Sequence, residues 1–598
     1  MGFAQARRAA CLTAIIGAME GVTPTAEPAS TGERLSRAAL WASIGAFTLL
    51  SLTVVIVIVW NALFNGAIWT GALGYVFDSM QYLAWVREGS DHFLSANLFD
   101  TAPLVRDYLN PGLIISSGLH RLGLSIPLAY AFWVPVGIAG LVVAVVKYAG
   151  EMLPKGWWRV AAIVLALTYK LPIKAILEGH VPKKSLDATT YAGFDAWPVY
   201  WSWGFSLTAV AVALLCFGLM RYDAVRSRGI RFSGSLSAIA LFCSWLQPWQ
   251  GATLLGVIIG GEIIGSLVLK GEDSAGLRGR MTLIGTTVLF GTAPLVYYSL
   301  LGKFDEAWRI NGIQANNYVA GASWWTAFAI LGPLVVGAAF ALRFRPERFR
   351  DVAIRLWPVV AIVQLIVIDA TQIGNTATHA LKGITIPLAV LTVIGVGPWF
   401  AQVAGSKRLG KVGPALSAAV AVALIGLLTV PGAINQVRLQ LDDMALEGRG
   451  GYSISKDDLR ALNYIASSPH KGSVYANSLY GSMVPWRTDR ATWVGHETWT
   501  PRFQGRSYFN EVALEGGLRT PTVGRGLTIA EVVRWTGAAF VLQDCYHSNN
   551  YLAKALAPIT KTRKNFYCAT VYEITPAPKA PAPPGIDRFH LNWTKRDG

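Results

Sequence analysis

The stretch "FDSMQYLAWVREGSDHFLSANLFD", residues 77–100, follows the first long apolar run of the chain and decides how the rest is interpreted. It contains four acidic residues, namely Asp78, Glu88, Asp91 and Asp100. Asp78, Tyr82 and Trp85 stand at i, i+4 and i+7, the spacing of side chains on one face of a helix. We therefore predict a helix that lies along a membrane surface with these three residues on one face.

The same letters offer a local explanation of Asp78. The run D-S-M-Q matches a capping box, in which Asp78 is the N-cap and Gln81 reaches back to the N-cap backbone. A cap of this kind stabilises a helix by about 1 kcal/mol. Taken alone, the stretch leaves both readings open: a helix cap and a functional carboxylate.

The composition identifies the setting as a membrane. Of the 598 residues, 53% are hydrophobic and only 15% are charged, well beyond what a soluble domain carries. A helix needs about 20 apolar residues to cross a bilayer. The runs that reach or approach this length are residues 38–60, 127–146, 157–176, 200–220, 234–246, 252–269, 281–301, 324–342, 356–368, 384–400 and 412–430. Residues 234–246 and 252–269 have a second interpretation as one re-entrant hairpin around "LQPWQG".

The basic residues predict the orientation, because short loops rich in Lys and Arg stay on the cytoplasmic side. Alternate loops are basic, beginning with Arg34 and Arg37 before the first span. Eleven spans then place the N-terminus inside and everything after residue 430 outside. Most of the net charge of +17 is explained by this topology, with no nucleic-acid partner. A cleaved signal peptide at "ARRAACLTAIIGAM" would reverse the pattern, so a cytoplasmic tail over 1–37 is favoured.

The pattern of apolar and polar residues changes at residue 435. "SISKDDLRALNYIASS", "TIAEVVRW" and "YLAKALAPI" have helical spacing, whereas "GSVYAN", "ATWVGH", "AAFVLQDC" and "YCATVYEI" are typical of short strands. We predict a polytopic α-helical membrane domain over 38–434 with a large outer loop at 61–126. An exoplasmic α/β domain over 435–576 and a Pro-rich tail over 577–598 follow.

Two cysteines, Cys545 and Cys568, fall together in the predicted outer domain. A disulfide between them is feasible in an oxidising compartment, and two unpaired core thiols are an equally open alternative. The chain has no Walker-type loop, no H-E-x-x-H and no C-x-x-C motif. The sequence therefore does not indicate a soluble enzyme of these classes.

The layout resembles the GT-C superfamily of integral-membrane glycosyltransferases. An apolar first span leads to a long outer loop in which an acid opens "DSMQYLAW", and "NP" precedes a second amphipathic segment. Many further spans and an outer α/β domain follow. The resemblance implies a catalytic acid in this loop, which falls on Asp78, and a polyprenyl-phosphate-linked sugar as donor. Many members have adjacent acids there, whereas this chain has Ser79. A divalent metal, Mg²⁺ or Mn²⁺, therefore stays an open alternative to an aspartate that acts alone as general base.

Transfer from a lipid phosphate also requires cations that hold the leaving group, and the outer ends of two spans offer them. Lys170 and Lys174 stand at i, i+4 around Pro172, and His379 and Lys382 open the tenth span in "THALKGITIP". We assign these four residues to substrate binding. The alternative is that each side chain reaches out of the bilayer to the interface.

Other outer residues are less specific. Tyr82 shares a face with Asp78, and we include it among the substrate-binding residues. "EGHVPKKSLDATTYAGFDAWPVYWSW" supplies Asp195, which we also include, together with Asp187, Tyr191 and Trp201. Carboxylates and aromatic faces suit a sugar, although such aromatic residues also form interfacial belts. For "LQPWQG", and for His496 and Glu497 in "WVGHETW", a structural role in the fold is the plainer interpretation.

We therefore predict a bacterial plasma-membrane enzyme that transfers a hexose or pentose, with inversion, from a polyprenyl phosphosugar to an exoplasmic glycan, lipid or protein. The alternative is a transporter or flippase of polyprenyl-linked saccharides or glycolipids. Such a protein typically has internal repeats and charged residues at mid-membrane, and the only such residue that we identify is Glu262.

Overall fold

The computed structural model describes most of the chain between residues 31 and 581. The described ranges are 31–102, 104–269, 276–319, 324–371, 374–410, 412–445, 451–515, 528–547 and 550–581. Residues 1–30 of the expected N-terminal tail and residues 582–598 of the Pro-rich tail lie outside them.

The chain is an integral membrane protein, as its apolar helices indicate. Within the described residues nine helical segments are long and apolar enough to cross a membrane. Their helices are α2 (Thr31–Phe64), α6 (Trp133–Met152), α11 (Ser206–Ser227), α13 (Pro248–Val268), α14 (Gly276–Phe304), α16 (Trp324–Ala339), α17 (Phe349–Thr371), α18 (Thr385–Ala404) and α19 (Val412–Ala445). The polytopic helical architecture expected from the sequence is confirmed.

The third of the eleven expected spans is shorter than the sequence suggested, and the fifth has the expected bounds but not the length of a full span. The third is α7 (Trp157–Thr168), which ends well before residue 176, because the backbone breaks ahead of α8 (Ile173–Leu177). The fifth is α12 (Gly234–Leu246), which packs against α11, α13 and α14. α12 and α13 meet closely at their turn, since a Cβ at Gly251 would collide with Ser244. Both short helices thus belong to the bundle although neither has the length of a full span.

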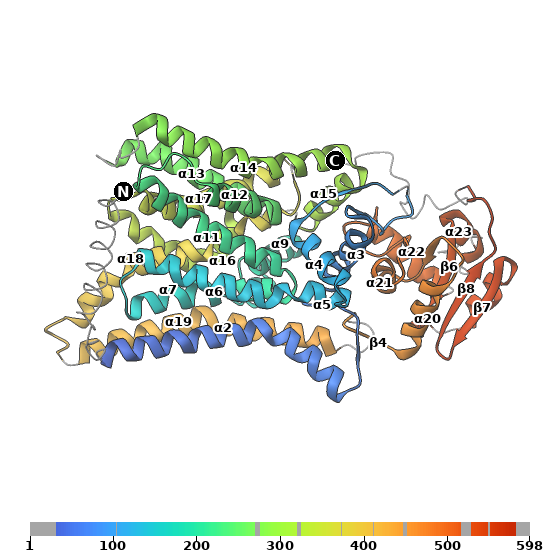
Figure 1. Ribbon diagram of the computed structural model, residues 1–598. Helices are drawn as coiled ribbons and strands as arrows, with labels where there is room; N and C mark the ends of the chain where they lie inside the picture. The colour runs from blue at the N-terminus through green and yellow to red at the C-terminus, as the bar shows by residue number, and fades with distance from the viewer. Residues whose placement is uncertain are drawn as a thin grey trace, which may run out of the picture.

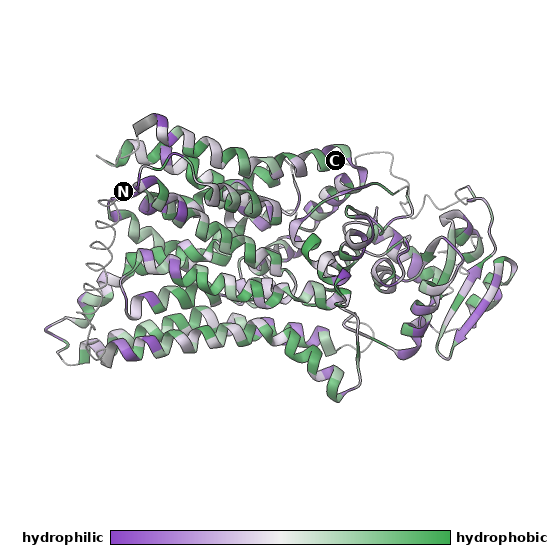
Figure 2. Cartoon of the chain, viewed as in Figure 1, coloured by the Kyte–Doolittle hydropathy of each residue, from purple (hydrophilic) through white to green (hydrophobic). Residues whose placement is uncertain are grey.

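The outer helices present apolar side chains to their surroundings. Leu63 of α2 is 72% exposed, Leu289 of α14 is 68% exposed and Val422 of α19 is 70% exposed. Figure 2 shows the hydrophobic colour over much of these helices. Water would not favour so much exposed apolar surface on a monomer, whereas lipid tails would. The bundle surface is therefore suited to a bilayer.

One end of the bundle carries the loop over 61–126 and the C-terminal domain, and α2 begins at the other end (Figure 1). The loop contains β1 (Ile68–Trp69), α3 (Val76–His92), β2 (Ser95–Ala96), β3 (Arg106–Tyr108), α4 (Pro111–Arg121) and α5 (Ile126–Ala131). β1 pairs with β4 (Ser453–Ile454) of the C-terminal segment, with Ile68 opposite Ile454. The first loop and the C-terminal segment are therefore joined by a pair of strands.

The C-terminal domain is an α/β unit, as expected. Its sheet has the order β5-β6-β8-β7, from β5 (Ser473–Tyr475), β6 (Ala538–Gln543), β7 (Thr560–Phe566) and β8 (Ala569–Ile574). β5 and β6 are parallel, and the other neighbours are antiparallel. The helices are α20 (Lys456–Ser467), α21 (Ser478–Thr488), α22 (Phe503–Glu515), α23 (Ile529–Thr536) and α24 (Tyr551–Leu556).

One strand assigned from the sequence was wrong, and one strand was missed. "ATWVGH" is a loop, because the backbone N–H of Thr492 donates to the carbonyl of Leu98 in the first loop, leaving only an isolated bridge to Val474. β7 was missed because its sequence, TKTRKNF, lacks the alternation of apolar residues that marks a half-buried strand. By contrast, α20 begins where the sequence indicated, since the Ser455 side chain accepts from the backbone N–H of Asp458.

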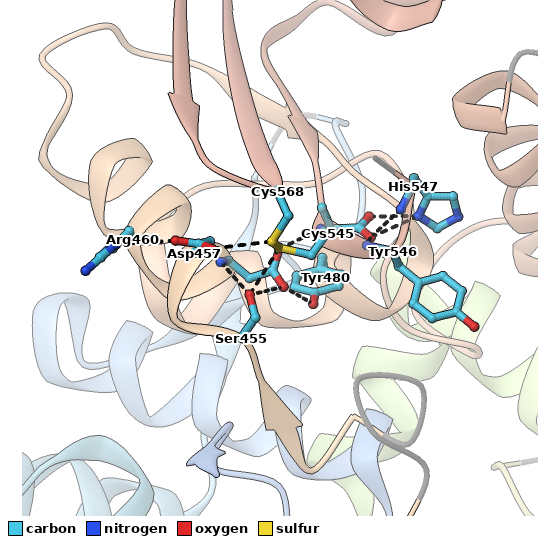
Figure 3. The surroundings of a disulfide bond; sticks show 10 residues. Ser455, Asp457, Arg460, Tyr480, Cys545, Tyr546, His547 and Cys568 are labelled. Atoms are coloured by element: carbon cyan, nitrogen blue, oxygen red, sulfur yellow. Dashed lines mark hydrogen bonds and ion pairs between the residues drawn. A yellow bond between two sulfur atoms is a disulfide. The ribbon is translucent and has the colours of Figure 1, made fainter. Parts of the chain in front are cut away.

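Cys545 and Cys568 form a disulfide that joins the loop after β6 to the start of β8 (Figure 3). The sequence had left this pairing open. The backbone N–H of Cys545 also donates to Asp458 Oδ1 at 3.0 Å, and Tyr480 donates to Asp458 Oδ2 at 2.6 Å. The disulfide and these hydrogen bonds hold the loop after β6 against α20 and α21.

Candidate active site

Asp78 lies in the first turn of α3, beneath the C-terminal domain. The helix begins at Val76, and its N-cap is Tyr75, whose side chain makes no capping hydrogen bond. The capping-box interpretation of Asp78 is therefore wrong, because the residue lies inside the helix. The Asp78 side chain is 28% exposed. A carboxylate in this position is available to a substrate.

α3 is packed against other elements of the protein, and its position along the membrane surface stays a prediction. It contacts α4 on one side and α21 of the C-terminal domain on another. The Trp486 indole donates to Met80 Sδ at 3.1 Å, and Arg87 donates to the Trp486 carbonyl at 2.9 Å. These contacts position the first turn of α3, and with it Asp78, relative to the C-terminal domain.

His496 of the C-terminal domain faces Asp78. Its Nε2 lies 3.2 Å from Asp78 Oδ1, and its side chain is only 2% exposed. The backbone N–H of Thr498 donates to His496 Nδ1 at 3.1 Å, so that nitrogen carries no proton. The proton of the neutral ring is therefore on Nε2. This N–H is close to Asp78 but is not aligned for a full hydrogen bond with any described residue.

The loop that carries His496 is held from two sides. Thr500 donates to the carbonyl of Phe99 in the first loop at 2.9 Å, and its hydroxyl accepts from the backbone N–H of His496 at 3.1 Å. Gln314 of α15 (Glu306–Tyr318) donates to the carbonyls of Thr498 and Thr500 at 2.9 and 2.8 Å. The position of His496 is thus fixed by three segments far apart in the sequence.

A second contact between the same two segments lies beside Asp78. The Tyr75 hydroxyl donates to Glu497 Oε2 at 2.8 Å. Burial, together with the nearby Glu497 carboxylate, raises the pKa of Tyr75 well above its usual value, so the hydroxyl keeps its proton. From the sequence, a structural role is the plainer interpretation of His496 and Glu497, whereas the structure places both beside Asp78. Both residues are visible in "WVGHETW", but no feature of the neighbouring sequence relates them to Asp78.

Asp195 forms a compact ionic group on the bundle side of the site. It ends α9 (Lys183–Asp195) and accepts from the Thr378 hydroxyl at 2.6 Å. His379 Nδ1 lies 3.0 Å from Asp195 Oδ2, and Lys382 Nζ lies 3.4 Å from Asp195 Oδ1. Burial alone would raise the pKa of Asp195, but the interactions with His379, Lys382 and the Thr378 hydroxyl outweigh it and hold the pKa well below its usual value. Asp195 is therefore an ionised acceptor.

The motif "LQPWQG" contacts the segment that carries His379 and Lys382. Gln250, in the first turn of α13, donates to the carbonyls of His379 and Lys382 at 3.1 and 3.3 Å. The Trp249 ring meets the His379 ring edge to face, with centroids 4.8 Å apart. The helical turn η2 (Ala377–Leu381) is thereby fixed against α13.

Asp78 and the Asp195 group are electrically coupled. The Asp78 carboxylate is near enough to raise the pKa of both His379 and Lys382, although burial lowers each of them more. Tyr200 is buried near both carboxylates, and its pKa is raised by burial first and then by Asp78 and Asp195. The sequence named Asp78, Asp195, His379 and Lys382 in separate segments, and the fold brings them to one region.

The remaining predicted substrate-binding residues have different surroundings. Lys170 is buried, donates to the Gly193 carbonyl at 2.8 Å and lies 4.7 Å from the centre of the Phe194 ring. Lys174 is exposed on α8, and a break in the helix around Pro172 separates it from Lys170. Tyr82 stacks on Tyr130 with centroids 5.2 Å apart.

Of the other residues singled out from the sequence, Tyr191 lies close to Tyr75 and Glu497 at the candidate site, and the acids have other surroundings. Asp91 and Asp187 are exposed. Asp100 pairs with Arg506 at 2.7 Å. Trp201 is fully buried and donates from its indole to the Asp195 carbonyl at 2.9 Å, so it is a support for α9.

Comparison with known proteins gives matches in structure only. No family model matches the chain, and no curated protein matches it in sequence. The apo oligosaccharyltransferase of Archaeoglobus fulgidus is 12% identical, with a TM-score of 0.44 over 86% of this chain and 71% of its own. Two structures of ArnT from Cupriavidus metallidurans, apo and bound to undecaprenyl phosphate, are each 12% identical.

The two ArnT matches have TM-scores of 0.36 and 0.39, cover 88% and 91% of this chain, and each covers 98% of the ArnT chain.

Proposed function

We propose that this chain is a glycosyltransferase that moves a sugar from a polyprenyl-phosphate donor to a hydroxyl group of a glycan, lipid or protein. The observation that carries the proposal is the approach of His496 to Asp78 within 3.2 Å, at the junction of the first loop and the C-terminal domain. A partly exposed carboxylate faced by a ring N–H suits a general base that takes a proton from an alcohol. The bundle beside it provides a lipid-linked donor with access from the bilayer.

The reaction follows from this arrangement of charges. The acceptor oxygen bonds to the anomeric carbon of the sugar on the face opposite the phosphate. The bond from that carbon to the phosphate oxygen breaks, and the electron pair leaves with the lipid phosphate. Asp78 receives the acceptor proton, and the N–H of His496 orients the Asp78 carboxylate. The configuration at the anomeric carbon is inverted, because attack and departure occur on opposite faces.

The leaving phosphate is assigned to the cations of the Asp195 group. His379 is 22% exposed and is the member most open to a ligand, whereas Lys382 is 1% exposed. Asp195 is a positioning residue, since its carboxylate already accepts from Thr378 and faces both cations. Preorganised cations of this kind stabilise charge that develops on a leaving phosphate.

A divalent metal does not suit the donors around Asp78. The backbone N–H of Thr498 occupies the lone pair of His496 Nδ1, so the single ring proton stays on Nε2, and the nitrogen that faces this carboxylate has no lone pair for a metal. The neighbouring Ser79 hydroxyl accepts from the backbone N–H of Leu73 at 3.1 Å. We therefore include no metal in the reaction, and transfer by purified protein is expected to continue in excess EDTA.

The assay that tests the function incubates purified protein in detergent with radiolabelled polyprenyl phosphosugars and a panel of glycan and lipid acceptors. Sugar transfer by the wild-type protein, lost in Asp78→Asn, is the expected result. A transporter or flippase of the same lipids needs no proton acceptor. Movement of donor across reconstituted vesicles, equal in wild type and Asp78→Asn and without any transfer, would replace the proposal.

The orientation of the protein belongs to the same proposal. The basic loops at the end of the bundle opposite the C-terminal domain favour the cytoplasm for that end, which makes the site exoplasmic. A reporter that is active only in the cytoplasm, fused after residue 435, is expected to be silent, and one active only outside is expected to be on. The opposite pattern would exclude an exoplasmic site.

A further inference from the structure

The C-terminal domain has a second cluster of polar side chains, at the carboxyl ends of its two parallel strands. β5 and β6 are neighbours, and the residues that follow them include Asn477 and Asp544. Asn477 donates from its amide to Asp544 Oδ2 at 2.8 Å. The carboxyl edge of adjacent parallel strands is where ligands bind in many open α/β sheets. The cluster therefore occupies the favoured edge of the sheet.

His547 is the centre of this cluster. It belongs to the short turn η4 (Cys545–His547), beside the disulfide, and Figure 3 shows its ring held at this turn. Its Nδ1 lies 2.9 Å from Asp544 Oδ2, and its Nε2 lies 2.8 Å from Glu511 Oε2. The side chain is 7% exposed. A carboxylate on one ring nitrogen, with the other nitrogen directed at further carboxylates, is the arrangement that orients histidines toward metal ions.

α22 supplies two carboxylates on one face. Glu511 and Glu515 stand at i, i+4, so their side chains lie one turn apart on the same side of the helix. One ligand atom each from Glu511, Glu515 and His547 lie within 4.8 Å of one another. Around a tetrahedral zinc ion with bonds of about 2.0–2.1 Å, ligand atoms are separated by roughly 3.3 Å. Small side-chain movements therefore bring the three groups to an ion.

A separate observation shows that this region is incomplete. The hydroxyl of Tyr475, at the end of β5, is fully buried and has no hydrogen-bond partner in the described part of the chain. The amide oxygen of Asn510 is also buried without a partner among the described residues. Buried polar atoms left unpaired are costly unless a ligand or an ion satisfies them.

We propose that Glu511, Glu515 and His547 bind a divalent cation of the zinc class, with Asp544 as the positioning residue for His547. One imidazole and two carboxylates are a donor set that suits Zn²⁺ better than Ca²⁺ or Mg²⁺, which prefer oxygen ligands alone. Binding replaces the proton on His547 Nε2 by the metal, and that proton passes to solvent. Glu515 is exposed, so the ion is open to solvent on that side. The site does not depend on the proposed transferase activity.

The test measures zinc in the full-length protein. Detergent-purified wild-type protein is stripped with chelator, loaded with Zn²⁺, dialysed and analysed for bound metal, and its affinity is measured by calorimetry. One equivalent of zinc is expected, with weaker binding of Ca²⁺ and Mg²⁺. Glu515→Gln is the decisive variant, because this side chain is exposed and its loss leaves the core intact. We expect Glu515→Gln and His547→Gln to lose the bound equivalent of zinc. Asp544→Asn should weaken zinc binding by about 10–100-fold.

Matched controls separate a site from general surface binding. His470→Gln removes another histidine of the same domain, and Glu306→Gln removes another exposed acid, on α15. Both are expected to bind zinc as the wild type does. Zinc is also expected to raise the melting temperature of the wild type but not of Glu515→Gln. Absence of stoichiometric zinc from the wild type, or full binding by Glu515→Gln and His547→Gln, would overturn the proposal.

Discussion

Asp78 and Asp195 are two carboxylates in one region of the molecule, and their surroundings are opposite. Asp195 is 10% exposed and accepts from Thr378, while its two oxygens also face His379 and Lys382. Asp78 is 28% exposed and accepts no aligned hydrogen bond from the described residues, although His496 Nε2 is 3.2 Å away. Groups of the protein occupy both oxygens of the Asp195 carboxylate, whereas the Asp78 carboxylate is available to a ligand.

This difference indicates different roles. A carboxylate that is saturated by cations and hydroxyl groups is held in its ionised form and has little capacity to accept another proton. A carboxylate with an open oxygen can take a proton from a ligand that approaches it. The comparison therefore assigns proton transfer to Asp78 and positioning of the cations to Asp195.

The largest expected effect follows from Asp78→Asn. The change keeps the shape of the side chain and removes the proton acceptor, so the rate of sugar transfer should fall by about 10²–10⁴-fold. Protein yield and melting temperature should stay at wild-type levels, because Asp78 is neither a helix cap nor buried. Radiolabel transfer at saturating donor measures the rate.

Asp91→Asn is the matched control for this change, since Asp91 lies on the same helix and is exposed. It should retain nearly full activity. Wild-type transfer by Asp78→Asn would remove this residue from catalysis and leave the acid unassigned.

Asp195→Asn should affect stability most. Its loss leaves the buried Lys382 cation without its partner, and breaking a buried ion pair typically costs about 3–5 kcal/mol. Because the folded-state pKa of Asp195 is depressed, its stabilisation is present above the unfolded value of about 4 and is lost as pH falls toward the folded value. Thermal unfolding in detergent against pH measures both effects.

A double variant tests whether the pair explains this loss. Asp195→Asn with Lys382→Met removes the unpaired charge as well, so part of the lost melting temperature should return. If the double variant is no more stable than Asp195→Asn, the ion pair is not the cause.

Lys382→Met should act mainly on donor binding. Removal of a cation that holds phosphate in the ground state raises the apparent KM for donor more than it lowers kcat. Lys174→Met serves as the comparison, because this lysine is exposed and lies on a separate short helix, and we expect little change from it. Steady-state kinetics over donor concentration distinguish the two, and equal KM values in both variants would argue against a phosphate site at Lys382.

The smallest expected effect concerns pH. Burial lowers the pKa of His379, with Asp195 opposing the shift, so the ring loses its charge at a lower pH than an ordinary histidine. The KM for an anionic donor should therefore rise with pH at values below about 6.5, the ordinary histidine pKa, and level off above it. His379→Gln should flatten this dependence while keeping a polar side chain. A wild-type KM that is constant over this range would exclude a charged His379 from donor binding.

The sequence was informative about single residues of the site and uninformative about their contacts. Asp78, Asp195, His379 and Lys382 could each be named, because charged residues at the outer ends of apolar spans are conspicuous. His496 could be seen but not assigned, since its partner lies in the first loop. The neighbouring contact of Tyr75 with Glu497 joins residues 422 positions apart. No periodicity or local spacing carries information over that distance.

Local physical chemistry determined the membrane class, the α/β texture of the C-terminal domain and the starts of helices such as α20, where Ser455 is the cap. These features depend on composition, on periodicity and on side chains within one turn of each other. Tertiary structure alone decided that α3 begins at Val76, so that Asp78 is not its N-cap. It also decided that "ATWVGH" forms a loop that contacts residues 61–126 and not a strand. The physical reason is that backbone groups of these segments find their partners across the domain junction, which outweighs their local preferences.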